Sequence, residues 1–121
     1  MERVRAIRGA TTLDADTRDQ VVGRTAGLLR EMLERNGVAP EDLISLIFTA
    51  TDDIHSEFPA AAARSIGISE IPLLCARELD IEGGVTLCIR ILMHCSTEKA
   101  PTALRHVYLE RARPLRTDLP E

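Results

Sequence analysis

The chain has 121 residues, a length typical of one domain, and its 45% hydrophobic and 28% charged residues exclude an intrinsically disordered protein. With a net charge of -4 and 2% aromatic residues, the chain offers neither the basic surface nor the stacking rings of a nucleic-acid-binding protein. No apolar run reaches the length of a membrane span, so no membrane partner is expected either.

The first elements along the chain are a strand and a long helix. Residues 3–12 alternate apolar with small or polar side chains, which predicts a short strand. Apolar residues then recur at helical spacing, and Gly37 suits a C-terminal cap. We therefore predict a helix over 14–36, within which Gly23 and Gly27 would allow close approach of a neighbouring element.

A second strand and a short helix are predicted in the middle of the chain. The segment 43–51 is apolar at odd and even positions alike, which predicts a strand covered on both faces. After a loop, Pro59 and Gly67 mark the start and end of a short helix over 59–67. The apolar segment 69–76 is predicted to be a buried strand.

The C-terminal part of the chain is predicted to be mainly β-structure. A long strand is expected over 85–97, and alternation places two sets on opposite faces: Leu87, Ile89, Ile91 and Met93 on one, and Cys88, Arg90, Leu92 and His94 on the other. Residues 105–112 are predicted to be a last strand. The polar residues 113–121 contain two prolines and are expected to be a mobile C-terminal tail.

The predicted order of elements is β-α-β-α-β-β-β over a single domain, residues 1–121. This order predicts an α+β fold, a mixed β-sheet with one long and one short helix packed on one face. Two helices cover only one face of such a sheet, so a neighbouring subunit is expected to cover the other.

The cysteines Cys75, Cys88 and Cys95 are odd in number and lie in apolar segments. Such residues are typical of reduced core positions in a cytoplasmic protein, and the N-terminal sequence lacks a secretory signal core. The histidines and nearby acids match no zinc-binding spacing, so no metal site is expected.

Arg90 is a fixed positive charge inside an otherwise apolar strand. Because a guanidinium keeps its proton and is costly to bury unpaired, Arg90 requires an anion, either from the protein or from a ligand. Arg8 and Tyr108 lie on other predicted strands, Glu78 in a loop and Arg116 in the tail. Guanidinium groups bind carboxylates through paired hydrogen bonds, so this set favours a pocket for a small, hydroxylated dianion.

Four segments closely resemble the trimeric, barrel-like class of monofunctional chorismate mutases: "IRGATT" (7–12), "SLIFTATDDIHSEFPAAAAR" (45–64), "LLCARELDIEGGVTLCIRILMH" (73–94) and "RHVYLERARPLRTDL" (105–119). The resemblance implies a homotrimer of β-rich subunits forming a pseudo-barrel, with active sites between neighbours. It also implies an isomerase of aromatic amino acid biosynthesis that rearranges chorismate to prephenate without a cofactor.

The resemblance further implies the site residues. The catalytic residues would be Arg8, Glu78, Arg90 and Tyr108. The substrate-binding residues would be Phe58, Ala60, Arg64, Leu73, Leu74, Cys75, Leu115 and Arg116. Two positions depart from the family pattern: Ala61 stands where a lysine is frequent, and Leu74 stands where a threonine is expected.

Two other functions remain open on the sequence alone. One is a trimeric small-molecule-binding or imine-hydrolysing protein on a similar scaffold, since fold by itself does not fix function. The other is a catalytically idle regulatory subunit, which the missing cation at Ala61 would favour. The joint presence of Arg8, Glu78, Arg90 and Tyr108 favours the enzyme.

Overall fold

The computed structural model describes residues 1–116, with the exception of the side chain of Arg116. Its helices and strands are β1 (Arg3–Thr12), α1 (Arg18–Asn36), η1 (Pro40–Asp42), β2 (Leu43–Ala50), α2 (Ala60–Ser65), β3 (Leu73–Arg77), β4 (Cys88–Thr97), η2 (Pro101–Ala103), β5 (Val107–Tyr108) and η3 (Glu110–Arg116). The α+β class predicted from the sequence is confirmed.

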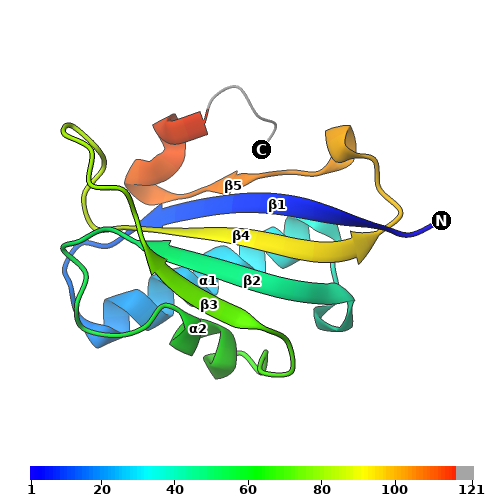
Figure 1. Ribbon diagram of the computed structural model, residues 1–121, viewed down its shortest axis with the longest axis horizontal. Helices are drawn as coiled ribbons and strands as arrows, with labels where there is room; N and C mark the ends of the chain where they lie inside the picture. The colour runs from blue at the N-terminus through cyan, green and yellow to red at the C-terminus, as the bar shows by residue number, and fades with distance from the viewer. Residues whose placement is uncertain (117–121) are drawn as a thin grey trace.

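The strands form one mixed sheet in the order β3-β2-β4-β1-β5 (Figure 1). The long strand β4 is antiparallel to both of its neighbours, β1 and β2. The outer strands β3 and β5 run parallel to β2 and β1 respectively. β1 and β4, which come from opposite parts of the chain, therefore lie side by side within the sheet.

One face of the sheet is covered by the helices, which lie behind the strands in Figure 1. Leu28, Leu29 and Met32 of α1 pack against strand residues such as Phe48 and Met93, and all five are completely buried. Burial of this aliphatic layer is the main source of stability in a chain with so few aromatic residues.

The opposite face, here called the open face, is covered at one end by η3, whose Ala112 and Leu115 pack with Ala10 and Cys88. Over β2 no element of the described residues covers it. On β2 the prediction of cover on both faces is therefore not met by the single chain: Leu46 and Phe48 are buried, whereas Ile47 and Thr49 are only half-buried. From Ile89 onward, buried and half-buried side chains alternate along β4, as predicted. The alternation places the core side chains on the face that the helices cover.

The long helix begins at Arg18 and not at residue 14. Thr17 is the N-cap, and its side chain accepts a hydrogen bond from the backbone N–H of Gln20 at 3.2 Å. Asp14 and Asp16 lie in the preceding turn. Their carboxylates accept hydrogen bonds from distant residues, which holds this segment outside the helix.

Three further predictions differ from the structure. The strand predicted as buried over 69–76 is β3, an edge strand that is mostly exposed in the single chain. The strand predicted over 85–97 begins only at Cys88, since Leu87 has a positive φ of 48°. A side chain added at Gly23 or Gly27 would meet nothing within 4 Å, so these glycines do not serve close packing among the described residues.

The strand predicted over 105–112 is only Val107–Tyr108. Glu110 has a positive φ of 51°, which ends the extended conformation, and η3 follows at once. Residues 113–116 of the predicted mobile tail belong to this helix, whereas residues 117–121 lie outside the described part of the chain.

Candidate active site

A pocket of about 450 Å³ opens on the open face of the sheet. It is lined by Arg8, Gly9, Ile47, Thr49, Glu78, Arg90, Ile91, Leu92 and Tyr108. The structure therefore brings together the four residues expected to be catalytic. Its size suits a small metabolite, and its wall is apolar apart from a few convergent polar groups.

The register of the sheet explains why these side chains meet. Ala10 of β1 pairs with Arg90 of β4 on one side and with Tyr108 of β5 on the other. Arg8 lies two residues before Ala10 and therefore on the same face. Thr49 of β2 pairs with Arg90 from the opposite side. Arg90 thus shares one face of the sheet with polar side chains of β1, β2 and β5.

Arg90 is paired with an acid of its own chain. Its Nε lies 2.9 Å from Oε1 of Glu78, and the two side chains are 33% and 17% exposed. The Nε–H does not point at the carboxylate well enough for a hydrogen bond, so the contact is an ion pair. Among the described residues Glu78 is the only carboxylate paired with Arg90, which leaves the terminal Nη groups without a second acid.

Glu78 is fixed by two contacts of its own. The hydroxyl of Thr49 donates a hydrogen bond to Oε2 of Glu78. The backbone N–H of Glu78 donates to the carbonyl of Ala50 at 3.0 Å, which extends the pairing of β2 with the end of β3. The carboxylate is therefore held beside Arg90 without a ligand.

Phe58 and Cys75 line a different pocket of the same chain. This second pocket is also about 450 Å³ and is formed by the loop after β2 and by the end of β3. Phe58 is 68% exposed, although large aromatic side chains are usually buried. Within the single chain the structure does not bring Phe58 or Cys75 together with Arg90.

Four other expected binding residues lie on α2 and β3, and they line neither of these two pockets. Ala60 is buried in the first turn of α2, and Arg64 is exposed near its end. Adjacent residues of β3 point to opposite faces: Leu73 packs against the core, whereas Leu74 is 61% exposed. Leu74, which departs from the family pattern, therefore presents an apolar side chain on the open face.

The two remaining residues lie on η3. Leu115 packs against a buried cluster that contains Ala10, Cys88 and Tyr108, directly beside the first pocket. Arg116 is the last residue of η3, and its side chain lies outside the described part of the structure.

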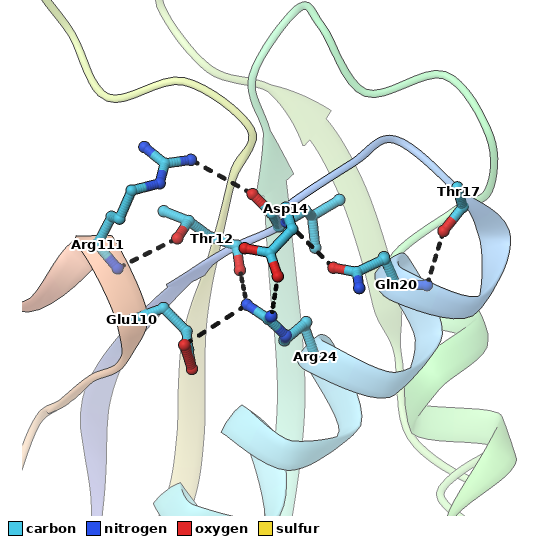
Figure 2. A network of polar contacts seen from close by, with 8 residues as sticks. Thr12, Asp14, Thr17, Gln20, Arg24, Glu110 and Arg111 are labelled. Atoms are coloured by element: carbon cyan, nitrogen blue, oxygen red, sulfur yellow. Dashed lines mark hydrogen bonds and ion pairs between the residues drawn. The ribbon is translucent and has the colours of Figure 1, made fainter.

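A polar network joins η3 to the start of α1 (Figure 2). Arg24 of α1 donates to the carbonyl of Thr12 and to the carboxylate of Asp14, both at 2.8 Å. Its Nη1 also lies 3.7 Å from the carboxylate of Glu110. These contacts hold the turn after β1 against the turn after β5.

Arg111 completes the network, and its hydrogen bond to Thr12 is drawn in Figure 2. Its backbone N–H donates to Oγ1 of Thr12 at 3.2 Å. Its Nη2 donates to the carbonyl of Leu13 at 3.3 Å and to that of Thr86 at 3.1 Å. The helix that carries Leu115 is thus tied to the end of β1 and to the loop that begins at Glu78.

Sequence analysis did not single out Thr49, which holds Glu78. Its place opposite Arg90 depends on the register of β2 against β4, which shifts at a bulge between Leu43 and Ser45. Hydrophobic alternation alone does not reveal a bulge, so the pairing of Thr49 with Arg90 was not visible in the sequence.

Cys88 lies two residues before Arg90 on β4, and its side chain is buried. Burial raises the pKa of the Cys88 thiol, and the nearby charge of Arg90 only partly opposes this effect, so the thiol stays protonated at neutral pH. In the described part of the chain, no group of three His, Cys, Asp or Glu side chains could hold a metal ion. No helix within residues 1–116 is long and apolar enough to cross a membrane.

Comparison with known proteins identifies the family. A profile of the family "Chorismate mutase type I" matches residues 4–119. The chorismate mutase AroH of Bacillus subtilis (strain 168) is 41% identical over 117 residues, which cover 96% of this chain and 92% of that protein. AroH of Thermus thermophilus is 46% identical over 117 residues, which cover 96% of this chain and 96% of that protein.

A solved structure gives the same result. The chorismate mutase from Clostridium thermocellum is 45% identical and superposes with a TM-score of 0.90, covering 91% of this chain and 98% of that one. None of these matches favours a binding protein or an imine hydrolase. The chain belongs to the type I chorismate mutase family and converts chorismate to prephenate.

Proposed function

We propose that the rearrangement of chorismate takes place in the pocket around Arg90. The observation that carries this proposal is that Arg8, Glu78, Arg90 and Tyr108 line one pocket on a sheet face with otherwise apolar walls. In the reaction one C–O bond breaks while one C–C bond forms within the same molecule. No nucleophile and no proton transfer are required, so the site needs only to position the substrate and to stabilise charge.

Arg90 stabilises the negative charge that develops on the ether oxygen as the C–O bond lengthens. Its Nε is paired with Glu78, and its Nη groups serve as the donors to the substrate. A donor that is already fixed in a half-buried pocket stabilises this charge better than water, because it does not have to reorient. Glu78 accepts a hydrogen bond from the ring hydroxyl and offsets the excess positive charge.

The other residues hold the substrate in its reactive shape. Arg8 and Tyr108 bind the carboxylate of the enolpyruvyl side chain, which keeps that side chain folded over the ring. Apolar walls come from Phe58, Leu74 and Leu115, and Cys75 lies beside the ring hydroxyl. Arg64 and Arg116 are outer cations for the carboxylates.

The active enzyme is a homotrimer with a pseudo-barrel and with active sites between neighbouring subunits. Two observations support this assembly. The open face carries exposed apolar side chains, including Val4 and Leu74 at 61% each. In addition, the expected site residues of one chain are divided between two separate pockets, so the Phe58 pocket of one subunit would complete the Arg90 pocket of the next. Three free cysteines support a cytoplasmic location.

Replacing Arg90 tests the assignment of charge stabilisation. Lysine keeps the charge but not the planar donor set, whereas citrulline keeps the shape and removes the charge. Both variants are expected to lower kcat for chorismate by about a hundredfold or more, the typical loss when one fixed donor to a developing oxyanion is removed. The loss of chorismate absorbance in the ultraviolet measures the rate.

Arg35→Lys is the matched control, because Nε of Arg35 also pairs with a carboxylate, that of Glu31 at 2.8 Å, but on the exposed surface of α1. It should retain wild-type turnover. Near-normal turnover of the citrulline variant would show that the charge of Arg90 does not drive the reaction.

A further inference from the structure

The imidazole of His106 is hydrogen-bonded to the backbone of β1 next to the Arg90 pocket. Its Nδ1 accepts a hydrogen bond from the backbone N–H of Arg8 at 2.9 Å. His106 immediately precedes β5, and Arg8 lies on β1, so a side chain here pairs with the backbone of the neighbouring strand. None of the roles assigned above uses His106.

This contact lengthens an unusually short strand pairing. β5 pairs with β1 only at Gly9–Val107 and Ala10–Tyr108, and one further bond runs from the N–H of Leu109 to the carbonyl of Ala10 at 2.9 Å. Isolated two-residue pairings are weak, because few hydrogen bonds oppose the entropy of ordering the chain. The His106 ring adds one bond at the end of this ladder, at the residue whose side chain lines the pocket.

The protonation state of the His106 ring allows Nδ1 to accept a hydrogen bond. Burial lowers the pKa of His106 below its ordinary value, so the ring is neutral at physiological pH. Since the backbone N–H of Arg8 is the donor, Nδ1 carries the lone pair and the proton is on Nε2. The hydrogen bond therefore fixes both the tautomer and the orientation of the ring.

We propose that His106 is a positioning residue for Arg8, fixing β1 against β5 so that the guanidinium of Arg8 and the hydroxyl of Tyr108 keep a set separation across the pocket. The two residues come from neighbouring strands joined by only two paired positions. A small slip between these strands would change the spacing of the two donors, and binding sites tolerate little misplacement. The proposal rests on the role proposed above for Arg8 in binding the substrate carboxylate.

Three substitutions at position 106 test the proposal. Asparagine places an oxygen acceptor close to the position of Nδ1, glutamine places its amide one bond further out, and leucine offers no acceptor. We expect His106→Asn to keep kcat/KM within about threefold of wild type. His106→Leu and His106→Gln should lower it by about tenfold or more, mainly through a higher KM, because Arg8 contacts the substrate in the ground state as well.

A double-mutant cycle with Arg8→Ala tests whether His106 acts on activity through Arg8. If His106 acts through Arg8, His106→Leu should change kcat/KM by less than about twofold once Arg8 is alanine, because interacting residues are not additive. Equal activities of the Asn, Gln and Leu variants, or a full additional loss in the Arg8→Ala background, would refute the positioning role. Thermal unfolding of each variant distinguishes a loss of activity from a loss of folding. If the leucine variant does not fold, the comparison of His106→Asn with His106→Gln tests the positioning role.

The cycle also separates this inference from the proposal on which it rests. Wild-type kcat/KM in Arg8→Ala alone would refute the role of Arg8 in substrate binding. A strong loss in Arg8→Ala combined with an additive effect of His106→Leu would leave the role of Arg8 intact and refute only the positioning by His106.

Discussion

At the scale of single residues, two glycines in regular elements have opposite surroundings. Gly9 lies on the core side of β1, where an added Cβ would stand 2.4 Å from Sδ of Met32 and 3.1 Å from Cδ1 of Leu28. Gly23 lies on α1, where an added Cβ would meet nothing within 4 Å. Gly9 is therefore needed for the close packing of α1 on the sheet, and Gly23 is not.

Alanine at these two positions should shift stability in opposite directions. Gly9→Ala is expected to destabilise the protein by about 1–3 kcal/mol, because Met32 is fully buried and must repack. Gly23→Ala should stabilise it by about 1 kcal/mol, since alanine favours the helical backbone. Urea unfolding followed by circular dichroism measures both. Equal urea midpoints for the two variants would show that α1 does not pack closely against Gly9.

At the scale of elements, the loop that carries Phe58 is held by the segment before α1. Oδ2 of Asp16 accepts a hydrogen bond from the backbone N–H of His55 at 2.8 Å. Oδ1 accepts two more from Ser56, one from its backbone N–H at 3.1 Å and one from its hydroxyl at 2.7 Å. Arg18 adds an ion pair with Glu57 at 2.9 Å. A side chain as exposed as Phe58 is thus presented by an ordered loop.

The Asp16 contacts predict a pH dependence of stability. The hydrogen bond from Ser56 is the largest contribution that lowers the pKa of Asp16, followed by those from the two backbone N–H groups. Because the folded-state pKa is below the unfolded value, the stabilisation is complete above about pH 4 and is lost as pH falls through the folded-state pKa. In Asp16→Asn, the free energy of unfolding should therefore be lower than in wild type at pH 7.

This difference should shrink toward pH 3, which urea unfolding at a series of pH values measures. The comparison between the two proteins removes the contributions of other carboxylates that titrate in the same range. A difference that stays constant with pH would mean that the carboxylate of Asp16 does not hold the loop through its charge.

At the scale of the whole molecule, the division of site residues between two pockets predicts complementation between inactive variants. Arg90→Ala removes the function of one pocket, and Phe58→Asp places a negative charge in the other, where it repels a dianionic substrate. Each variant alone should be nearly inactive. In a homotrimer with sites between subunits, refolding an equal mixture restores about a quarter of the sites, because each intact half comes from a different chain.

The activity of the co-refolded mixture is measured against each variant refolded alone and against wild type treated in the same way. Size-exclusion chromatography with light scattering gives the number of subunits. A monomer, or a mixture no more active than its components, would contradict the shared site.

The sequence by itself determined the class of the fold, the order of its main elements and the family, because these depend on hydrophobic periodicity, capping residues and motifs that are local in the chain. It failed where local patterns compete with distant contacts. Asp14 and Asp16 resemble residues of a first helical turn, but they bond to Arg24 and to the loop at His55, and the helix begins only after them.

Only the tertiary structure decided which residues form the pocket. The sequence placed Arg8, Glu78, Arg90 and Tyr108 on separate segments, and only their shared chemistry and the family resemblance grouped them. The register of four strands brings them together and adds Thr49, whose hydroxyl holds Glu78. Register follows from backbone hydrogen bonds and packing between distant strands, and a shift of one residue would turn these side chains to the other face of the sheet.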